Sequence, residues 1–219
     1  FMPGAKRWSI EEKAAQRYVA GGAILFACIF SALGICRYMS FGTFGDFAIF
    51  AHQIWGFSEF SMVQLVGNGL HPFGNHISPV LLLLTPFYWI WPDPRVIFCI
   101  QNIVIAAGVI PLYWLSRDHL RSPLAGVVIC FGYLLYPALQ LSAAAEFHES
   151  HLITTLFLFT FYFLQTRAYR NFIIFGLLTI MCKEDITLLI GMCGLYIIYR
   201  HRNYKFGSGV ILFSAIWLF

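Results

Sequence analysis

Charge is scarce in this sequence, and the stretches without charge define its class. Charged residues make up 11% of the chain and hydrophobic residues 59%, whereas soluble proteins contain about 25% charged residues. No charged residue occurs between Arg17 and Arg37, between Arg95 and Arg117, or between Arg121 and Glu146. A helix needs about 20 apolar residues to cross a membrane. The pattern therefore excludes a soluble protein and predicts an integral membrane protein.

Two other patterns are also missing. The six cysteines all lie inside apolar runs and form no C-x-x-C pair, so we interpret them as small packing residues and not as a disulfide or metal framework. The net charge of +4 comes from basic residues that are scattered through the loops. No nucleic-acid partner is expected from such a distribution. The basic residues indicate instead on which side of the membrane each loop lies.

The first expected span covers about Tyr18–Cys36. Four basic residues precede it and only Arg37 follows closely, which places the N-terminus in the cytoplasm. These four are Lys6, Arg7, Lys13 and Arg17. The apolar stretch is too long for a typical signal peptide, so we expect it to be retained. The chain stops inside the apolar run Gly207–Phe219 and is expected to be the N-terminal part of a longer protein.

Residues 43–91 are expected to form an external region within a single transmembrane domain, 1–219. Polar residues interrupt Thr43–His76 and many aromatic residues accompany them, which predicts short helices on the outer surface. Ile77–Trp91 is apolar but short and contains Pro79 and Pro86. If it crossed, the basic loops would divide almost evenly between the two sides. If it does not cross, nearly all are cytoplasmic, which is the favoured arrangement.

Six further spans follow from this choice, giving about seven in all. They are about Val96–Ser116, Ser122–Ala144, Leu152–Gln165, Phe172–Cys182, Ile186–Tyr199 and the residues from Phe206 onward. The chain is thus predicted to be an all-α polytopic transmembrane helical bundle of the plasma membrane. A break is expected at Lys183-Glu184-Asp185, because charges near the bilayer centre cost about 2.5–3.5 kcal/mol each. The functional face is predicted to be extracytoplasmic.

Three polar clusters fall on that face, and Asp46 lies in the first. It is a candidate general base or metal ligand, and Gln53 would share its helix face if Asp46–Phe57 is helical. A solvated carboxylate or helix N-cap is the alternative. His71 and His76 flank a Pro- and Gly-containing loop, and either is a candidate ligand, with an isolated histidine as the alternative.

The second cluster is A-E-F-H-E-S-H at residues 145–151. Helical spacing would pair Glu146 with Glu149 and His148 with His151. Imidazole and carboxylate groups suit a divalent metal ion, so Glu149 and His148 are candidate metal ligands. The spacing differs from the H-E-x-x-H of zinc proteases. A polar start to an interfacial helix is the alternative.

Lys183 and Glu184 mark the third cluster. Lys183 is a candidate contact for an anionic group such as phosphate, which a compact ammonium suits. The alternative is a local ion pair with Glu184 or Asp185.

Taken together, these motifs resemble a family of prokaryotic membrane proteins. They are D-F-A-I-F-A-H-Q-I-W from Asp46, N-H-I-S-P around His76, Q-N at Gln101, E-F-H-E from Glu146 and K-E-D from Lys183. The combination is similar to the domain-of-unknown-function family DUF2079, over about Ala20 to Tyr199. That family is similar in turn to the GT-C superfamily of membrane glycosyltransferases, whose members use polyprenyl-phosphate-linked sugars on the external face.

The resemblance implies a GT-C-like fold and inverting sugar transfer. Asp46 would accept the proton of an acceptor hydroxyl, and the phosphate of the polyprenyl donor would leave toward Lys183. Gln53, His76, His148 and Glu184 would contact the substrate, and His148 with Glu149 would orient the sugar or hold a divalent ion. This chain has Phe-His-Glu where better-known members carry an aspartate. A transporter and a non-catalytic membrane scaffold are the alternative functions.

Overall fold

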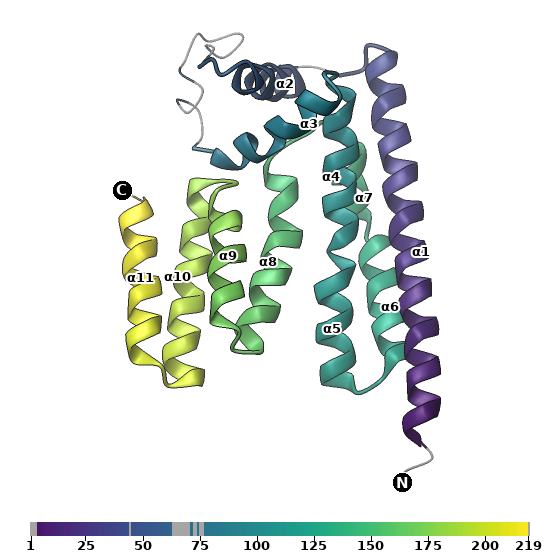
Figure 1. Cartoon of the computed structure of the whole chain (residues 1–219), viewed down its shortest axis with the longest axis vertical. Coiled ribbons are helices and arrows are strands. Elements are labelled where there is room, and N and C mark those ends of the chain that lie inside the picture. The colour runs from purple at the N-terminus through teal and green to yellow at the C-terminus, as the bar shows by residue number, and fades with distance from the viewer. Residues whose placement is uncertain (1–3, 44, 63–70, 72–73, 75–76, 219) are drawn as a thin grey trace. The chain divides into compact units, whose positions relative to one another are not determined.

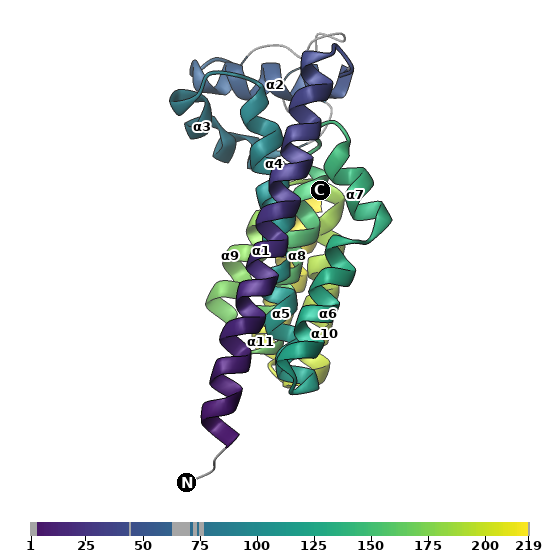
Figure 2. The same cartoon turned by 90° about the vertical axis from the view of Figure 1, so that its right-hand side faces the viewer.

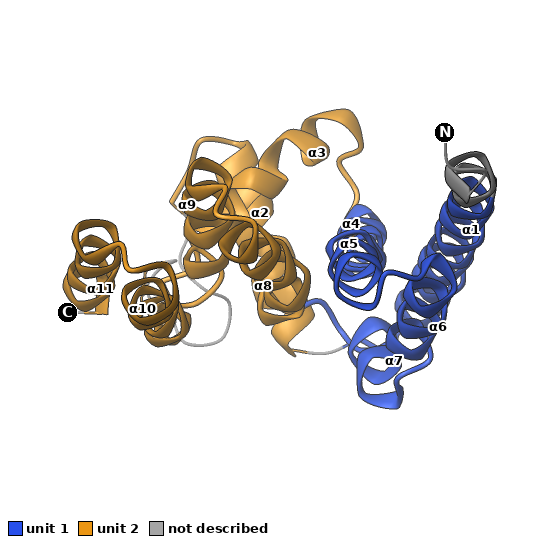
Figure 3. Ribbon diagram, turned by 90° about the horizontal axis from the view of Figure 1, so that it is seen from below, with its two compact units in different colours: residues 1–44, 95–147 blue, residues 45–94, 148–219 orange. Residues whose placement is uncertain are grey.

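The computed structural model describes residues 4–43, 45–62, 71, 74 and 77–218. Within these residues the regular elements are all helices and no strand occurs, which confirms the predicted all-α class. The chain forms two compact units, coloured separately in Figure 3. Unit 1 comprises residues 1–44 and 95–147, and unit 2 comprises residues 45–94 and 148–219. The stretch after the first helix therefore belongs to the same unit as the C-terminal helices.

Within the described residues, unit 1 contains the longest helix, α1, and four shorter helices. They are α1 (Gly4–Met39), α4 (Arg95–Ala107), α5 (Val109–Leu120), α6 (Pro123–Leu134) and α7 (Pro137–Ala144). As Figure 1 shows, α1 packs against α4 and α6, and α5 packs against α6. The apolar core between them includes Phe26, Ile105, Val109 and the fully buried Cys130.

Proline residues explain where the helices of unit 1 break. Pro111 has no N–H for the carbonyl of Ala107, and the helix is interrupted at Gly108 between α4 and α5. Pro137 follows the break between α6 and α7, which meet at a bend of 51°. The expected span Ser122–Ala144 is therefore a bent helix pair.

Unit 2 contains two helical hairpins. The first is formed by α8 (Ser150–Gln165) and α9 (Tyr169–Ile180), and the second by α10 (Thr187–Tyr196) and α11 (Tyr204–Leu218). Two short elements complete the connections, the 3-10 helix η2 (Glu184–Ile186) and the π-helical turn η3 (Ile197–His201). Because α9 ends at Ile180, the chain breaks before the charged trio, as the sequence predicted.

The four hairpin helices of unit 2 are short. The longest, α8, has 16 residues and extends about 24 Å at 1.5 Å per residue, less than the roughly 30 Å hydrocarbon core. Two helical stretches of the described chain are long and apolar enough to cross a membrane, Glu11–Met39 and Arg95–Leu120, and the bent pair α6 and α7 is a third candidate. The total of about seven spans stays a prediction.

Three short helices lie across one end of the hairpins (Figures 1 and 2). They are α2 (Gly45–Ser58), η1 (Pro79–Leu84) and α3 (Thr85–Ile90), and α2 packs along the other two. The indole N–H of Trp89 donates to the Ser58 carbonyl at 3.0 Å, and the Val80 N–H donates to the Met181 carbonyl at 3.0 Å. Pro79–Ile90 therefore lies at the end of unit 2 that holds the α9–α10 connection. Its non-crossing interpretation stays a prediction.

Two glycines bring α10 and α11 together. A Cβ atom on Gly207 would lie 2.8 Å from the Gly194 carbonyl oxygen, and one on Gly194 would lie 2.9 Å from the Gly207 carbonyl oxygen. Close backbone contact through small residues is typical of helix pairs in membranes. The second hairpin depends on these two positions.

Candidate functional site

Asp46 lies in the first turn of α2 and is exposed. The apolar side chains of Phe47, Phe50 and Ile54 are buried and fix the helix on unit 2. A carboxylate in the first turn interacts favourably with the helix dipole. Gln53, two turns further along, is 3% exposed, so α2 presents Asp46 and buries Gln53.

The chain between α7 and α8 is not helical. Residues 145–149 form a bend, an irregular segment and a turn, and α8 begins at Ser150. The predicted helical pairing of Glu146 with Glu149 is therefore wrong. Glu146 belongs to unit 1, where its Oε1 is 3.9 Å from Nη2 of Arg37. His148 and Glu149 are the first residues of the second segment of unit 2, and the His151 N–H donates to the His148 carbonyl at 3.0 Å.

Glu149 is the most unusual side chain of this turn, because its carboxylate is completely buried. Its Oε2 is 3.0 Å from Nδ1 of His148, and Oγ of Ser150 is 2.9 Å from the same nitrogen. Despite the short ion-pair distance, neither Glu149 oxygen has an aligned hydrogen bond within the described part of the chain. Burying a carboxylate in this way is costly, and such groups are concentrated at functional sites.

His148 links Glu149 to two other charged residues. Its ring packs edge-on against Phe50 of α2, with 5.1 Å between ring centroids. The adjacent Glu149 carboxylate raises the pKa of His148, burial opposes this rise, Asp46 adds to it and Lys183 reduces it. Asp46 and Lys183 thus both lie within electrostatic reach of His148. Residues from three separate parts of the sequence therefore influence one imidazole.

Lys183 stands directly before η2. Its Nζ is 3.7 Å from Oδ2 of Asp185, whose side chain is 59% exposed. An exposed pair at this distance is weak, so the ammonium keeps the capacity to bind an anion. Glu184 has a structural contact, because one of its carboxylate oxygens accepts a hydrogen bond from the Ile77 N–H at 3.2 Å.

Unit 2 therefore brings together most of the residues that the sequence singled out. Asp46, His148, Glu149 and Lys183 lie at the same end of the unit, whereas His76 falls outside the described residues. The rings of His148 and His151 are 6.0 Å apart. Sequence reasoning missed Phe50 and Ser150 as neighbours of His148. Their only signals were the position of Phe50 one turn after Asp46 and that of Ser150 inside the heptapeptide.

The donors do not gather into a metal centre in the described ranges. No three His, Cys, Asp or Glu side chains there are placed to hold a metal ion together. His148 and Glu149 supply two donors, and these already contact each other. The arrangement suits acid-base chemistry and anion binding, because the exposed Asp46 carboxylate and the Lys183 ammonium both lie within electrostatic reach of the partly buried His148 imidazole.

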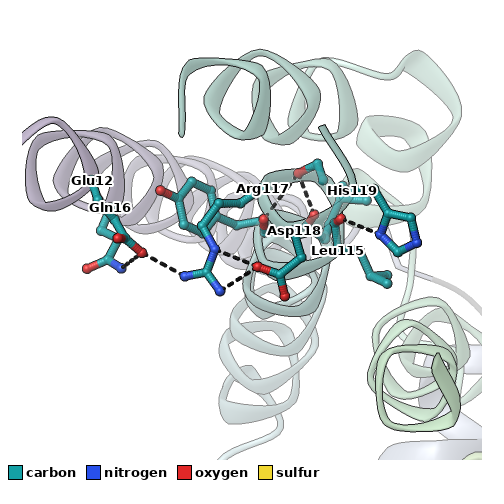
Figure 4. Close-up of polar contacts among 9 residues, drawn as sticks. Glu12, Gln16, Leu115, Arg117, Asp118 and His119 are labelled. Atoms are coloured by element: carbon teal, nitrogen blue, oxygen red, sulfur yellow. Dashed lines mark hydrogen bonds and ion pairs between the residues drawn. The ribbon is translucent and has the colours of Figure 1, made fainter. Parts of the chain in front are cut away.

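A second charge cluster lies in unit 1 and has a different character. Nη1 of Arg117 is 2.6 Å from Oε1 of Glu12, and Nη2 is 2.7 Å from Oδ1 of Asp118 (Figure 4). Nδ1 of His119 is 2.9 Å from the Leu115 carbonyl oxygen. Both carboxylates have a guanidinium partner and all three ionic side chains are partly exposed. This cluster links α1 to α5, and each of its two carboxylates is paired with Arg117.

Comparisons with known proteins agree with the membrane class. A family model described as a predicted membrane protein, DUF2079, matches residues 37–219. Neither the curated proteins nor the solved structures yielded a match. The matched region contains the whole of unit 2 and the site built around His148.

Proposed function

Because this chain belongs to the DUF2079 family of predicted membrane proteins, we propose that it is a multi-pass membrane glycosyltransferase of GT-C-like fold. It transfers a sugar from a polyprenyl-phosphate donor to an acceptor hydroxyl on the extracytoplasmic face. The observation that supports this proposal is the buried Glu149 carboxylate held 3.0 Å from Nδ1 of His148, an imidazole that also lies within electrostatic reach of Asp46 and Lys183. There, the Asp46 carboxylate can take up a proton while Lys183 and His148 bind an anion.

The reaction is a single inverting displacement. The acceptor oxygen attacks the anomeric carbon of the sugar as Asp46 takes its proton, and the bond between that carbon and the phosphate oxygen breaks. The polyprenyl phosphate leaves with the electron pair. General-base assistance of this kind is worth about 10²–10⁴-fold.

Lys183 and His148 stabilise the charge that develops on the leaving phosphate. Glu149 acts as a positioning residue, because its contact with Nδ1 orients the imidazole. Substrate contacts by Gln53 and Glu184 stay predictions, because Gln53 is buried and Glu184 accepts a hydrogen bond from the Ile77 N–H. Use of a divalent ion remains a sequence-based prediction, and the proposed reaction does not require the ion.

Charge segregation in unit 2 supports the proposed orientation. The α8–α9 and α10–α11 connections and the first turns after them carry five basic residues, Arg167, Arg170, Arg200, Arg202 and Lys205. The acidic residues of unit 2 lie in its other loops and short helices. Basic loops favour the cytoplasm. In the proposed topology of about seven spans, the hairpin helices cross and the His148 end faces outward.

A transfer assay tests the proposal. Radiolabelled sugar on polyprenyl phosphate is supplied to the purified protein, and the wild type is compared with Asp46→Asn. Transfer should fall about 10²–10⁴-fold. Glu59→Gln is the matched control, because Glu59 is also exposed and lies just after α2; it should keep wild-type transfer. Equal transfer by Asp46→Asn and wild type would remove Asp46 from the mechanism. Solute accumulation in proteoliposomes without sugar transfer would favour a transporter.

The orientation has a separate test. Single cysteines are placed at Asp185 and His119, both exposed, in a background without native cysteines. An impermeant thiol reagent applied to intact cells should label position 185 and not position 119. The reverse pattern would contradict the proposed sidedness.

A further inference from the structure

An apolar groove of about 330 Å³ runs between α9 and α11, away from the His148 site. Its walls include Ile173 and Leu177 from α9 and Phe213 from α11, and Ile190 of α10 lies at its floor. Figure 3 shows the three helices side by side within unit 2. Ile173, Leu177 and Phe213 are 38–44% exposed. The groove is therefore open to the surroundings along its length.

Glycines create much of this space. Gly209 lines the groove, and a Cβ atom added there would have no atom within 4 Å. Gly176 also lines it, and its nearest neighbours would be in ordinary contact at 3.8 and 3.9 Å. A side chain at Gly209 would fill the groove without disturbing the helix packing.

One end of the groove is basic. Lys205 is the charged residue that lines it, and it has no carboxylate partner in the described part of the chain. The rings of Tyr169 and Phe206 are 4.5 Å apart, which brings the first turns of α9 and α11 together. Arg170 and Lys205, the residues next to those rings, are both exposed.

No acidic residue balances this charge nearby in the sequence. Residues 150–182 and 186–218, which contain the four hairpin helices, include five Lys and Arg residues and no Asp or Glu. The OH of Tyr169 and Nδ1 of His201 are 3.1 Å apart, joining the two basic connections. The combination is an apolar groove with positively charged residues at one end.

We propose that this groove binds one anionic phospholipid, with an acyl chain between α9 and α11 and its phosphate at Lys205 and Arg170. Charge complementarity selects this occupant, because basic residues at a membrane surface attract anionic lipids. A zwitterionic lipid would gain the apolar contact but less of the electrostatic attraction. The site is distinct from the proposed donor site and does not depend on sugar transfer.

Competition between two lipids tests the proposal. Delipidated wild-type protein in detergent micelles is given equal amounts of phosphatidylglycerol and phosphatidylcholine, and bound lipids are counted by native mass spectrometry. Phosphatidylglycerol should be preferred, and Lys205→Gln should lower the preference about fivefold. Gly209→Leu should reduce the occupancy of both lipids. Gly209→Ala is the milder variant if the leucine impairs folding.

Two matched controls lie in unit 1. Lys13→Gln removes an exposed lysine from α1, and Gly132→Leu adds a side chain where nothing lies within 4 Å on α6. Both should keep wild-type lipid binding. Equal binding of the two lipids by the wild type, or unchanged binding by both Gly209 variants, would overturn the proposal. A groove that took up polyprenyl phosphate in place of phosphatidylglycerol would also overturn it.

Discussion

One cluster of charged groups in unit 1 forms ion pairs at the surface, whereas unit 2 buries a carboxylate that has no aligned hydrogen bond within the described residues. Glu12, Arg117 and Asp118 form contacts of 2.6 and 2.7 Å while remaining partly exposed. Glu149 is completely buried, and its close ionic partner, His148, lies within reach of two further charges. The first arrangement stabilises a helix pair at little cost. The second costs stability, and such a cost is commonly retained where function requires it.

Helix length separates the two units in the same way. Unit 1 contains helices of spanning length, with apolar side chains and few polar interruptions. Unit 2 consists of short helices whose connections carry the polar residues. The helices of unit 1 include the candidates for membrane spans by length, and the short helices of unit 2 leave several helix ends close together, where a site can form.

The largest expected effect is a loss of sugar transfer when the Glu149 carboxylate is removed. Glu149→Gln should reduce sugar transfer about 10²-fold, because His148 loses the group that orients it. Arg117→Gln, the matched change in unit 1, should leave transfer per folded molecule unchanged. The measurement is the transfer of radiolabelled sugar from polyprenyl phosphate, as for Asp46→Asn. If Arg117→Gln lost as much activity as Glu149→Gln, the division between the two clusters would be wrong.

A packing effect of about 1–3 kcal/mol should follow in unit 2. Gly207→Ala places a methyl group against the backbone of Gly194, so the thermal unfolding midpoint in detergent should fall. Gly132→Ala in unit 1 meets nothing within 4 Å and should be neutral or slightly stabilising, because alanine favours the helix. A rise in the midpoint of Gly207→Ala would contradict the close contact of α10 and α11.

Removal of the ion pair in unit 1 should cost less. Arg117→Gln is expected to destabilise the protein by about 0.2–1 kcal/mol, the usual value for a partly exposed pair. Unfolding midpoints at low and high salt would check this. Wild-type and variant midpoints should converge as salt rises, because exposed charges are screened. A difference that did not depend on salt would indicate packing and not charge.

The smallest effect concerns pH. The folded-state pKa of His148 is raised above its ordinary value of 6.5, chiefly by Glu149. The stabilisation from this contact is therefore complete below about pH 6.5 and is lost as the pH rises through the raised pKa. The difference in unfolding midpoint between wild type and His148→Gln should shrink from pH 6 to pH 9. A difference that grew with pH would have the wrong sign.

Sequence reasoning predicted the helical class and the long spans, because gaps in charge report directly on membrane helices. It also predicted the break at Lys183–Asp185 from the cost of buried charge. It did not predict the bend before Pro137 or the interruption at Gly108. Apolar composition does not show whether a proline bends a helix or interrupts it. The two-unit division also escaped it, because it depends on contacts between distant segments.

The candidate site was predicted in part. Asp46, His148, Glu149 and Lys183 were chosen for their chemical type, and the fold brings them together. Helical spacing failed for Glu146, because Ala145–Glu149 is an irregular connection and the heptapeptide is divided between the units. The burial of Glu149 and its contact with His148 depend on tertiary packing, which residue spacing alone does not reveal.

The central claim, that unit 2 retains its buried charges for function and unit 1 uses its charges for stability, has one direct test. Thermal unfolding would be compared for wild type, the double variant His148→Leu/Glu149→Leu and the double variant Glu12→Gln/Arg117→Gln. Replacing a buried ion pair with apolar residues is often neutral or stabilises by about 1–4 kcal/mol. We predict an equal or higher unfolding midpoint for the unit 2 variant and a lower one for the unit 1 variant. A clearly lower midpoint for the unit 2 variant, with an unchanged unit 1 variant, would contradict the claim.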